Sequence, residues 1–359
     1  MSKTLSNGLR TTLRISLAAL SGLLLAVPAV AGEQGYKVLP AIERGNLAVF
    51  PVVAGSSHDT SQLLTLDEGV RSGQVTVTEA GDERGLVRPG QHVPPRHEGA
   101  QVNSLVLYNN SNRPLLLLAG EIVTGGKQDR VIGADRIVPP NSGPIDLGVF
   151  CVEPGRWVAS SANFGSMGAQ MAQPSVRTPA MAEHDQGKVW ANVRASKEKM
   201  SRNLSAPESA ALEQTSSYAK TFDSVPVRKA VAAYGGAGNE QEILRELRAK
   251  GAVGVVVAVN GRVLWADVFA STDLLAKYWP KLMRSYVAEA MTSDNRNAKA
   301  DLHEAELYMN LLSGGHEVVE TEPDVFRRTE IKGDGFRVFE LASLLPKTGF
   351  NIHLTKIRE

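Results

Sequence analysis

The sequence of 359 residues predicts an α+β protein, with a β-rich first half and a second half that mixes helices and strands. Short apolar runs separated by turn-forming residues occupy residues 46–160, and this region shows no sustained helical period. Apolar residues at helical spacing begin near His184, and residues 236–345 combine both patterns. Strands followed by helices and then by mixed elements favour α+β over a doubly wound parallel sheet.

The composition is that of a globular protein. Hydrophobic residues make up 43% of the chain and charged residues 21%, which excludes a disordered or collagen-like protein. Lys and Arg total 39 and Asp and Glu total 38, so no basic excess indicates nucleic acid as a partner. The single cysteine, Cys151, excludes an intramolecular disulfide and a multi-cysteine zinc site.

Residues 1–31 have the three parts of a signal peptide. A basic stretch precedes an apolar run at residues 15–27, and the small residues Ala29 and Ala31 fit a cleavage site. The run is too short to span a bilayer comfortably, and no later run approaches ~18 apolar residues. We therefore expect export to the periplasm or the extracellular space, with no stable membrane span after cleavage. An uncleaved membrane anchor is the alternative.

A single domain is expected over residues 40–345, followed by a C-terminal strand at 346–359. Its first part should be a sandwich or a barrel-like antiparallel sheet, because its apolar runs are short and bounded by turns. The three expected parts are the β-rich residues 46–160, a loop with helices at 161–235, and the mixed α/β residues 236–345.

Prolines and glycines mark the connections. Residues 163–182 are rich in Gly, Met, Gln, Ser and Pro and predict a long loop, because Pro174 and Pro179 oppose a continuous helix. Asn260-Gly261, between two apolar runs, predicts a β-hairpin. Residues 272–291 predict a helix that Pro280 should kink or divide.

The segment Gly120–Arg130 (GEIVTGGKQDR) is the most informative for function. With Gly125-Gly126 as a two-residue turn, counting outward places Glu121 opposite Arg130 and puts Glu121, Val123, Gln128 and Arg130 on one face. The full set of expected cross-strand pairs is Thr124 with Lys127, Val123 with Gln128, Ile122 with Asp129, and Glu121 with Arg130.

This polar hairpin has two interpretations. As a ligand site, Arg130 and Lys127 would bind an anionic or hydroxyl-rich group, and Glu121 and Gln128 would fix its orientation. As a solvated hairpin, it would carry surface salt bridges that contribute little to stability. A single cross-strand Glu–Arg pair is worth only roughly 0.2–1 kcal/mol, so stability alone is a weak reason for so many polar groups.

The second polar segment is Cys151–Trp157 (CVEPGRW). After a turn at Pro154-Gly155, Arg156 can stack on Trp157 or reach back to Glu153. A nucleophilic cysteine needs a nearby base, and no His lies within about thirty residues of Cys151 in the sequence. A buried structural thiol is therefore expected there.

Other motifs predict neither a metal nor a cofactor. His92, His97 and Glu98 lack the spacing of a cupin metal site and indicate a polar loop. The glycines at 235–238 follow a helix and lack the Lys-Ser/Thr pair of a phosphate loop, so they indicate a helix stop and linker.

Three segments together resemble a known family. They are GEIVTGGKQDRVIGADRIVPPNS, CVEPGRW and VNGRVLWADVFASTDLLAKYWPKLMRSYVAEA. They are similar to the ARG and Rhodanese-Phosphatase-superfamily-associated protein domain family, over roughly residues 40–345. The resemblance implies an α+β domain and a link to nucleotide or ADP-ribose chemistry. It also implies family-site roles for Glu121, Gln128, Arg130, Glu153, Arg156 and Trp157.

Three functions follow from these observations. The favoured one is a binding module for a small polar or anionic ligand, because no nucleophile–base pair or metal cluster is evident from the spacing. The second is a hydrolase-like enzyme acting on a phosphate- or ADP-ribose-type substrate, with Glu121 or Glu153 as general base and Arg130 as anion clamp. The third is a structural or protein-interaction envelope protein, whose partner the sequence does not identify.

Overall fold

The computed structural model describes residues 35–80, 104–156, 161, 163–235, 240–293 and 298–359. The predicted signal peptide, the histidines at 92 and 97 with Glu98, Trp157 and most of the glycine segment 235–238 lie outside these residues. Residues 35–359 form one compact unit. The described residues are 32% helical and 34% strand, with antiparallel sheets, which confirms the predicted α+β class.

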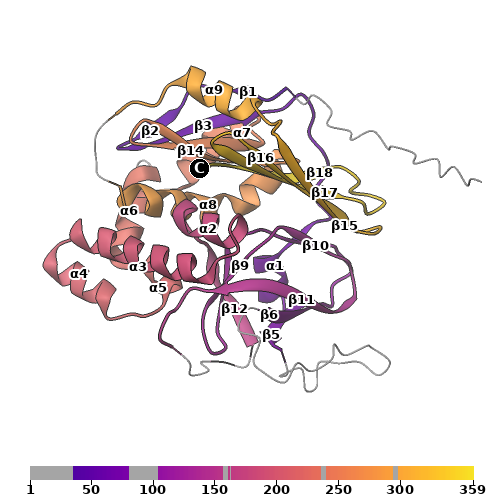
Figure 1. Cartoon of the computed structure of the whole chain (residues 1–359), viewed down its shortest axis with the longest axis horizontal. Coiled ribbons are helices and arrows are strands. Elements are labelled where there is room, and N and C mark those ends of the chain that lie inside the picture. Colours follow the sequence, from indigo (N-terminus) through magenta and orange to yellow (C-terminus); the bar gives the residue numbers. More distant parts are fainter. Residues whose placement is uncertain (1–34, 81–103, 157–160, 162, 236–239, 294–297) are drawn as a thin grey trace, which may run out of the picture. The chain divides into compact units, whose positions relative to one another are not determined.

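A large antiparallel sheet forms one part of this unit (Figure 1). Its strand order among the described residues is β1-β3-β13-β14-β18-β17-β16-β15, with β2 paired to β3 outside this path. The first half of the chain therefore contributes strands to the C-terminal sheet. The strands are β1 (Lys37–Val38), β2 (Ile42–Arg44), β3 (Leu47–Val53), β13 (Gly254–Val259), β14 (Arg262–Phe269), β15 (His316–Glu322), β16 (Phe326–Gly333), β17 (Phe336–Ser343) and β18 (Asn351–Arg358).

A closed barrel forms the second part, as the turn-bounded apolar runs predicted. Its order is β11-β6-β5-β12-β8-β9, and a three-stranded sheet, β10-β7-β4, lies beside it in the described chain. The strands are β4 (Leu64–Thr65), β5 (Val75–Glu79), β6 (Ser104–Asn109), β7 (Leu115–Leu117), β8 (Glu121–Thr124), β9 (Arg130–Ile132), β10 (Arg136–Val138), β11 (Ser142–Cys151) and β12 (Asn163–Met171).

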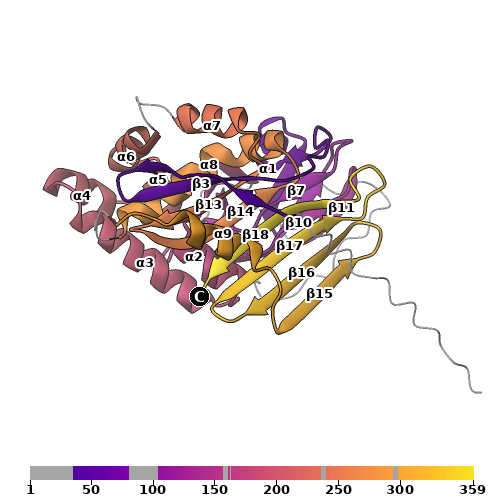
Figure 2. The same ribbon diagram turned by 90° about the horizontal axis from the view of Figure 1, so that it is seen from above.

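Helices connect and cover these sheets (Figure 2). None of the helices within the described residues is long and apolar enough to cross a membrane. They are α1 (Leu66–Arg71), α2 (Pro174–Met181), α3 (Gln186–Arg202), α4 (Ala206–Glu213), α5 (Tyr218–Phe222), α6 (Val225–Gly235), α7 (Glu240–Ala249), α8 (Thr272–Met291) and α9 (Leu302–Asn310).

Both faces of β13 are buried, which explains its continuous apolar run. Val255 and Val257 pack into the core that also contains α8 and part of the barrel wall. Val256 and Ala258, on the opposite face, pack into a second core that contains α9. Alternating side chains of one strand thus serve two cores, as the two-residue period of a strand requires.

The predicted loop at 163–182 is wrong, because β12 and α2 occupy it. Pro174 is tolerated at the start of α2, where its missing N–H has no helical partner to lose. Pro179 removes the hydrogen bond that would reach the Ser175 carbonyl, and Asn192 replaces it by donating to that oxygen at 2.7 Å. Tertiary contacts therefore override the local signal.

The predictions for the Asn260-Gly261 hairpin and for the helix at 272–291 had different outcomes. Val259 pairs with Arg262, and both Asn260 and Gly261 have positive φ, so the predicted two-residue hairpin is confirmed. Helix α8 continues through Pro280 and is not divided.

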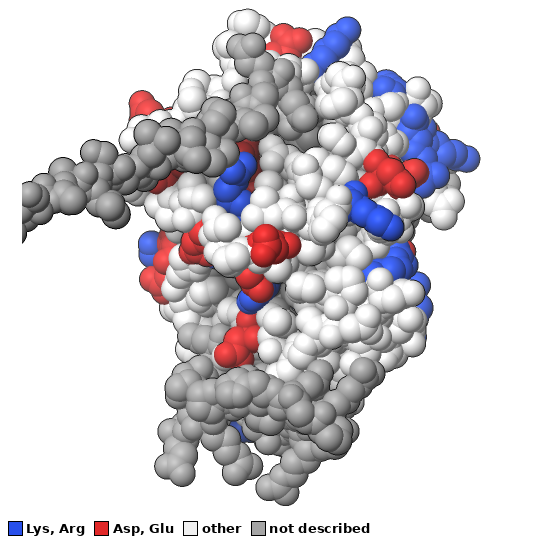
Figure 3. Space-filling view, turned by 90° about the vertical axis from the view of Figure 1, so that its right-hand side faces the viewer, with Lys and Arg blue, Asp and Glu red and all other residues white. Residues whose placement is uncertain are grey.

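Strand β15 was not predicted, because its residues are almost all exposed and give no apolar alternation. Figure 3 views this side of the molecule and shows acidic and basic side chains interspersed.

A buried carboxylate on β14 connects the sheet to α2 and α8. Asp267 accepts hydrogen bonds from Arg177, Trp265, Tyr286 and Thr355, at 3.0 Å for Arg177 Nη1 and 2.9 Å for Trp265 Nε1. Burial opposes ionisation, but Arg177 and His353 outweigh it and hold the pKa of Asp267 far below its usual range. The ion pair is fully buried, so removing either partner leaves an uncompensated charge.

His353 on β18 extends this network to the barrel side. Its Nδ1 lies 2.6 Å from Asp135 Oδ2, and its Nε2 lies 3.3 Å from Asp267 Oδ1. Asp135 precedes β10 and also accepts the Ala119 N–H at 2.7 Å. Burial alone would lower the pKa of His353, but the two carboxylates raise it to about 9. A protonated imidazole therefore bridges the sheet and the loop before β10.

This bridge predicts a pH dependence of stability. The folded protein holds the His353 proton with a pKa of about 9 against 6.5 in the unfolded chain, so the stabilisation is complete below pH 6.5 and is lost as the pH rises through 9. The expected loss is about 3 kcal/mol of unfolding free energy. Urea unfolding at pH 6.5 and 9 measures it. Lys356, whose pKa is lowered to about 8 mainly by burial, opposes this trend, so the His353 contribution is the difference between wild type and His353→Gln. The exposed His303→Gln should behave as wild type; equal slopes in all three proteins would contradict the bridge.

Candidate functional site

The β8–β9 hairpin exists, but its register differs from the predicted one. Val123 pairs with Arg130 and Ile122 with Val131, so the connection is a longer loop and Glu121 does not face Arg130. The cause lies in Asp129. Its carboxylate accepts the Gly125 N–H at 3.3 Å, and its own N–H donates to Glu153. Side chains satisfy these backbone groups in place of a strand ladder.

Glu121 is in a separate buried contact with α8. Its carboxylate lies 2.5 Å from Lys281 Nζ and accepts the Leu118 N–H at 2.7 Å. Lys281 also binds Asp67 of α1. Burial lowers the pKa of Lys281, but the two carboxylates outweigh it and keep the ammonium charged. Glu121 thus joins the barrel to α1 and α8, and it forms no hydrogen bond or ion pair with the other predicted site residues that the structure describes.

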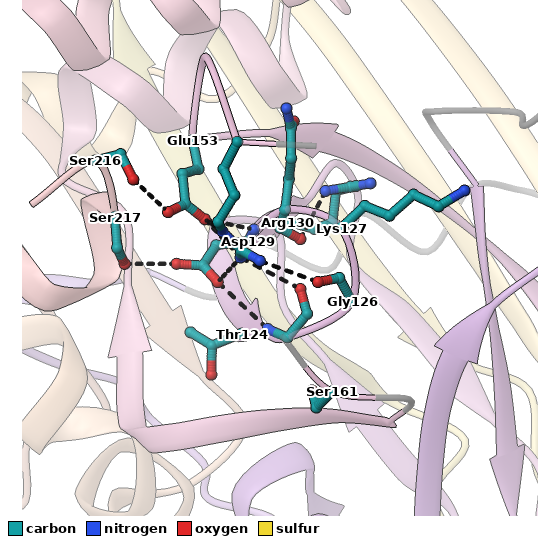
Figure 4. Close-up of polar contacts among 12 residues, drawn as sticks. Thr124, Gly126, Lys127, Asp129, Arg130, Glu153, Ser161, Ser216 and Ser217 are labelled. Carbon is teal, nitrogen blue, oxygen red and sulfur yellow. Dashed lines mark hydrogen bonds and ion pairs between the residues drawn. The ribbon is translucent and has the colours of Figure 1, made fainter. Parts of the chain in front are cut away.

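The remaining polar residues gather at one end of the barrel. The pairs Thr78–Asn163, Thr124–Gly165 and Arg130–Cys151 place the end of β5, the β8–β9 loop and the end of β11 at that same end. We call the group the barrel-end cluster (Figure 4). It comprises Glu79, Lys127, Gln128, Asp129, Arg130, Glu153, Arg156, Ser216 and Ser217.

Arg156 holds the centre of the cluster together. Its Nε donates to Glu153 at 2.6 Å, and its Nη2 lies 3.2 Å from Asp129. Its Nη1 donates to the Gly126 carbonyl at 3.0 Å. The predicted contact from Arg156 back to Glu153 is confirmed. One guanidinium therefore pairs with two buried carboxylates and fixes the loop between β8 and β9.

Two serines reach the cluster from the segment before α5. Ser217 donates to Asp129 Oδ2 at 2.6 Å, and the exposed Ser216 donates to Glu153 Oε1 at 2.8 Å. Burial raises the pKa of Asp129, and the charge of Glu153 adds to this effect, although Ser217, Gly125 and Arg156 oppose it. The helical layer thus completes a site that the barrel begins.

Arg130 and Gln128 form the innermost part. Arg130 Nη1 donates to the Gln128 carbonyl at 2.6 Å, and Nη2 lies 3.5 Å from Glu79. The Gln128 side chain is 0% exposed, and within the described residues neither its Nε2 nor its Oε1 has a hydrogen-bond partner; the same holds for Arg130 Nε. Buried polar atoms are rarely left unpaired, so three of them in two contacting residues require an explanation.

The remaining residues of the two predicted polar segments are Lys127, Trp157 and Cys151. Lys127 is exposed, and its backbone N–H donates to Glu79 at 3.0 Å. Trp157 lies outside the described residues. Cys151 is buried, and burial raises the pKa of its thiol, which suits a structural cysteine better than a nucleophile. The Gln186 side chain accepts a hydrogen bond from the Cys151 N–H and donates one to the Cys151 carbonyl, both at 2.8 Å.

Several cluster members were missed in the sequence. Ser216, Ser217 and Glu79 lie far from the β8–β9 loop along the chain, and no spacing rule connects them to it. Asp129 was assigned to the opposite hairpin face, because the two-residue turn placed it opposite Ile122.

A pocket of about 40 Å³ lies outside the barrel-end cluster and is lined in part by Asp135, His184 and Phe339. Within the described ranges, no group of His, Cys, Asp and Glu suits a metal ion.

The loop requires glycine at position 126, where φ is +48°. An added Cβ would lie 2.3 Å from the Phe164 ring and 2.6 Å from Glu79 Oε1. We expect Gly126→Ala to lower the unfolding free energy by about 1–3 kcal/mol, through overpacking and backbone strain. Gly148→Ala, where nothing lies within 4 Å of the added Cβ, is the matched control. Equal denaturation midpoints for the two variants would refute the packed-loop geometry.

Comparison with known proteins agrees with the resemblance noted in the sequence. The family model described as ARG and Rhodanese-Phosphatase-superfamily-associated Protein domain matches residues 35–355. Neither the curated proteins nor the solved structures contain a match to this chain. Because the family model spans nearly all of the described chain, this protein belongs to the ARG and Rhodanese-Phosphatase-superfamily-associated Protein domain family.

Proposed function

We propose that this protein binds a small polar ligand at the barrel-end cluster. The observation that carries the proposal is the Gln128 carboxamide, which is fully buried and finds no partner for its donor or its acceptor in the part of the chain that the structure describes. Leaving each such group unpaired costs about 1–3 kcal/mol. A typical domain has a total stability of only about 5–15 kcal/mol, so a binding partner for this amide is the economical explanation.

The surroundings of Gln128 support a binding role. The Arg156 side chain is 20% exposed and Lys127 is exposed, so the cluster has an edge that reaches solvent. Contacts from the barrel and from the segment before α5 fix its geometry before any ligand arrives. Such preorganisation lowers the entropic cost of binding. We further propose that the protein acts after export, from the signal-peptide pattern of residues 1–31.

A ligand screen tests the binding proposal. Sugars, nucleosides, amino acids and phosphates are added to the full chain, and thermal unfolding is followed. A ligand at 100 times its Kd should stabilise the protein by about 2.7 kcal/mol. Arg156→Lys should reduce this shift, because a lysine cannot reproduce the several contacts of the guanidinium. Arg44→Lys, at a partly exposed ion pair, should keep it.

The screen can fail in two ways. If no compound class stabilises the wild-type chain, the binding proposal is refuted. If a ligand stabilises wild type and Arg156→Lys equally, binding occurs away from the barrel-end cluster.

One observation favours a hydrolase as the second candidate. The exposed hydroxyl of Ser216 donates to the buried Glu153, whose other oxygen is held by Arg156. This geometry allows Glu153 to accept a proton from Ser216 or from water during attack on a phosphate- or ADP-ribose-type ester. Arg130 is 1% exposed and already contacts Glu79 and Gln128, which argues against its use as an anion clamp.

An activity assay separates the two candidates. The binding proposal predicts no turnover of p-nitrophenyl phosphate or of an ADP-ribose ester by the purified chain. A hydrolase would show turnover that Ser216→Ala reduces by roughly 100-fold or more, the usual size of a lost proton-transfer step. Ser57→Ala, at an exposed serine outside the cluster, is the control. Turnover that Ser216→Ala reduces and Ser57→Ala does not would refute the prediction of no turnover and would favour the hydrolase.

A further inference from the structure

The unpaired atoms of the cluster have a definite hydrogen-bonding pattern. Gln128 Nε2 is a donor, Gln128 Oε1 is an acceptor, and Arg130 Nε is a second donor. Arg130 contacts the backbone of Gln128, because its Nη1 donates to the main-chain carbonyl of Gln128 at 2.6 Å. A ligand that satisfies the carboxamide must therefore offer an acceptor and a donor side by side.

Simple ions do not satisfy this pattern. A carboxylate or a fully deprotonated phosphate offers acceptors alone, so it would place negative oxygen against Gln128 Oε1. An alkylammonium offers donors alone, so it would face the N–H groups of Gln128 and Arg130. Either ion would leave one half of the buried carboxamide unpaired and would lose the corresponding stabilisation.

The charges of the cluster also disfavour an anion. Arg130 lies 3.5 Å from Glu79, and Arg156 contacts both Asp129 and Glu153. An anion would have to displace one of these buried carboxylates from its guanidinium. Lys127 makes no ion pair with the rest of the described chain, but it is exposed, where a single charge pair is screened by solvent.

We propose that the ligand is recognised through a neutral group of the carboxamide type, with its C=O accepting from Gln128 Nε2 and its N–H donating to Gln128 Oε1. This inference rests on the proposed binding function and names the ligand chemistry of that site. The two parallel hydrogen bonds form a closed amide–amide pair, which satisfies the donor and the acceptor of the Gln128 carboxamide together.

Acetamide and acetate are the matched probes, because they have nearly the same shape and differ in charge and in the donor. The full chain is labelled with ¹⁵N, and the side-chain amide resonance of Gln128 is assigned by its loss in Gln128→Met. We expect acetamide to shift this resonance and to bind at least 10-fold more tightly than acetate. Gln128→Met should weaken acetamide binding at least 10-fold, and Gln214→Met, at an exposed glutamine, should leave it unchanged.

A charge-changing variant makes the test independent of lost packing. Measured above the pKa of the new carboxyl group, Gln128→Glu replaces the carboxamide donor with an acceptor, so it should also weaken acetamide binding. Thermal unfolding of both variants shows whether each is folded. If acetate or inorganic phosphate binds as tightly as acetamide and Gln128→Met has no effect, the ligand chemistry is wrong while the binding site stands.

If neither probe shifts the Gln128 resonance, and water-exchange signals show an internal water at the carboxamide, then water is its partner. Both the ligand chemistry and the binding function at this cluster would then be overturned.

Discussion

The buried ion pair between Arg177 and Asp267 fixes the relation between sheet and helices on which the rest of the described structure depends. Asp267 collects donors from α2, α8, β14 and β18, so one carboxylate ties together segments that lie far apart in the sequence. Through His353 and Asp135 the same network reaches the loop before β10. A buried charge without its counter-charge is costly, so this network favours the arrangement of sheet and helices that keeps Arg177 paired with Asp267.

A second buried network acts on the barrel in the same way. Lys281 of α8 binds Glu121 of β8 and Asp67 of α1, which fixes β8 against the helices. Because β8 leads directly into the Gly125–Asp129 loop, the position of the barrel-end cluster follows from this contact. Glu121, which the sequence suggested as a ligand residue, instead supports the site from the interior of the protein.

Local patterns in the sequence predicted what depends on local physics. The two-residue Asn260-Gly261 turn, the turn-bounded strands of the barrel and the Glu153–Arg156 contact all rest on neighbouring residues. The register of the β8–β9 hairpin was wrong, because Asp129 pairs with groups that the local sequence does not show. Ser216 and Ser217 were missed for the same reason, since their hydrogen bonds span large sequence separations.

The two classes of buried polar group in this protein differ in one respect that bears on function. The carboxylates of Asp129, Glu153 and Asp267 have donors for their oxygens, as residues retained for structure should. Gln128 is as deeply buried, yet its carboxamide has no hydrogen-bond partner among the described residues. A group kept only for packing would be replaced at lower cost by an apolar side chain of similar volume. The unmet hydrogen bonds of Gln128 are therefore the feature of the barrel-end cluster that stability alone does not explain.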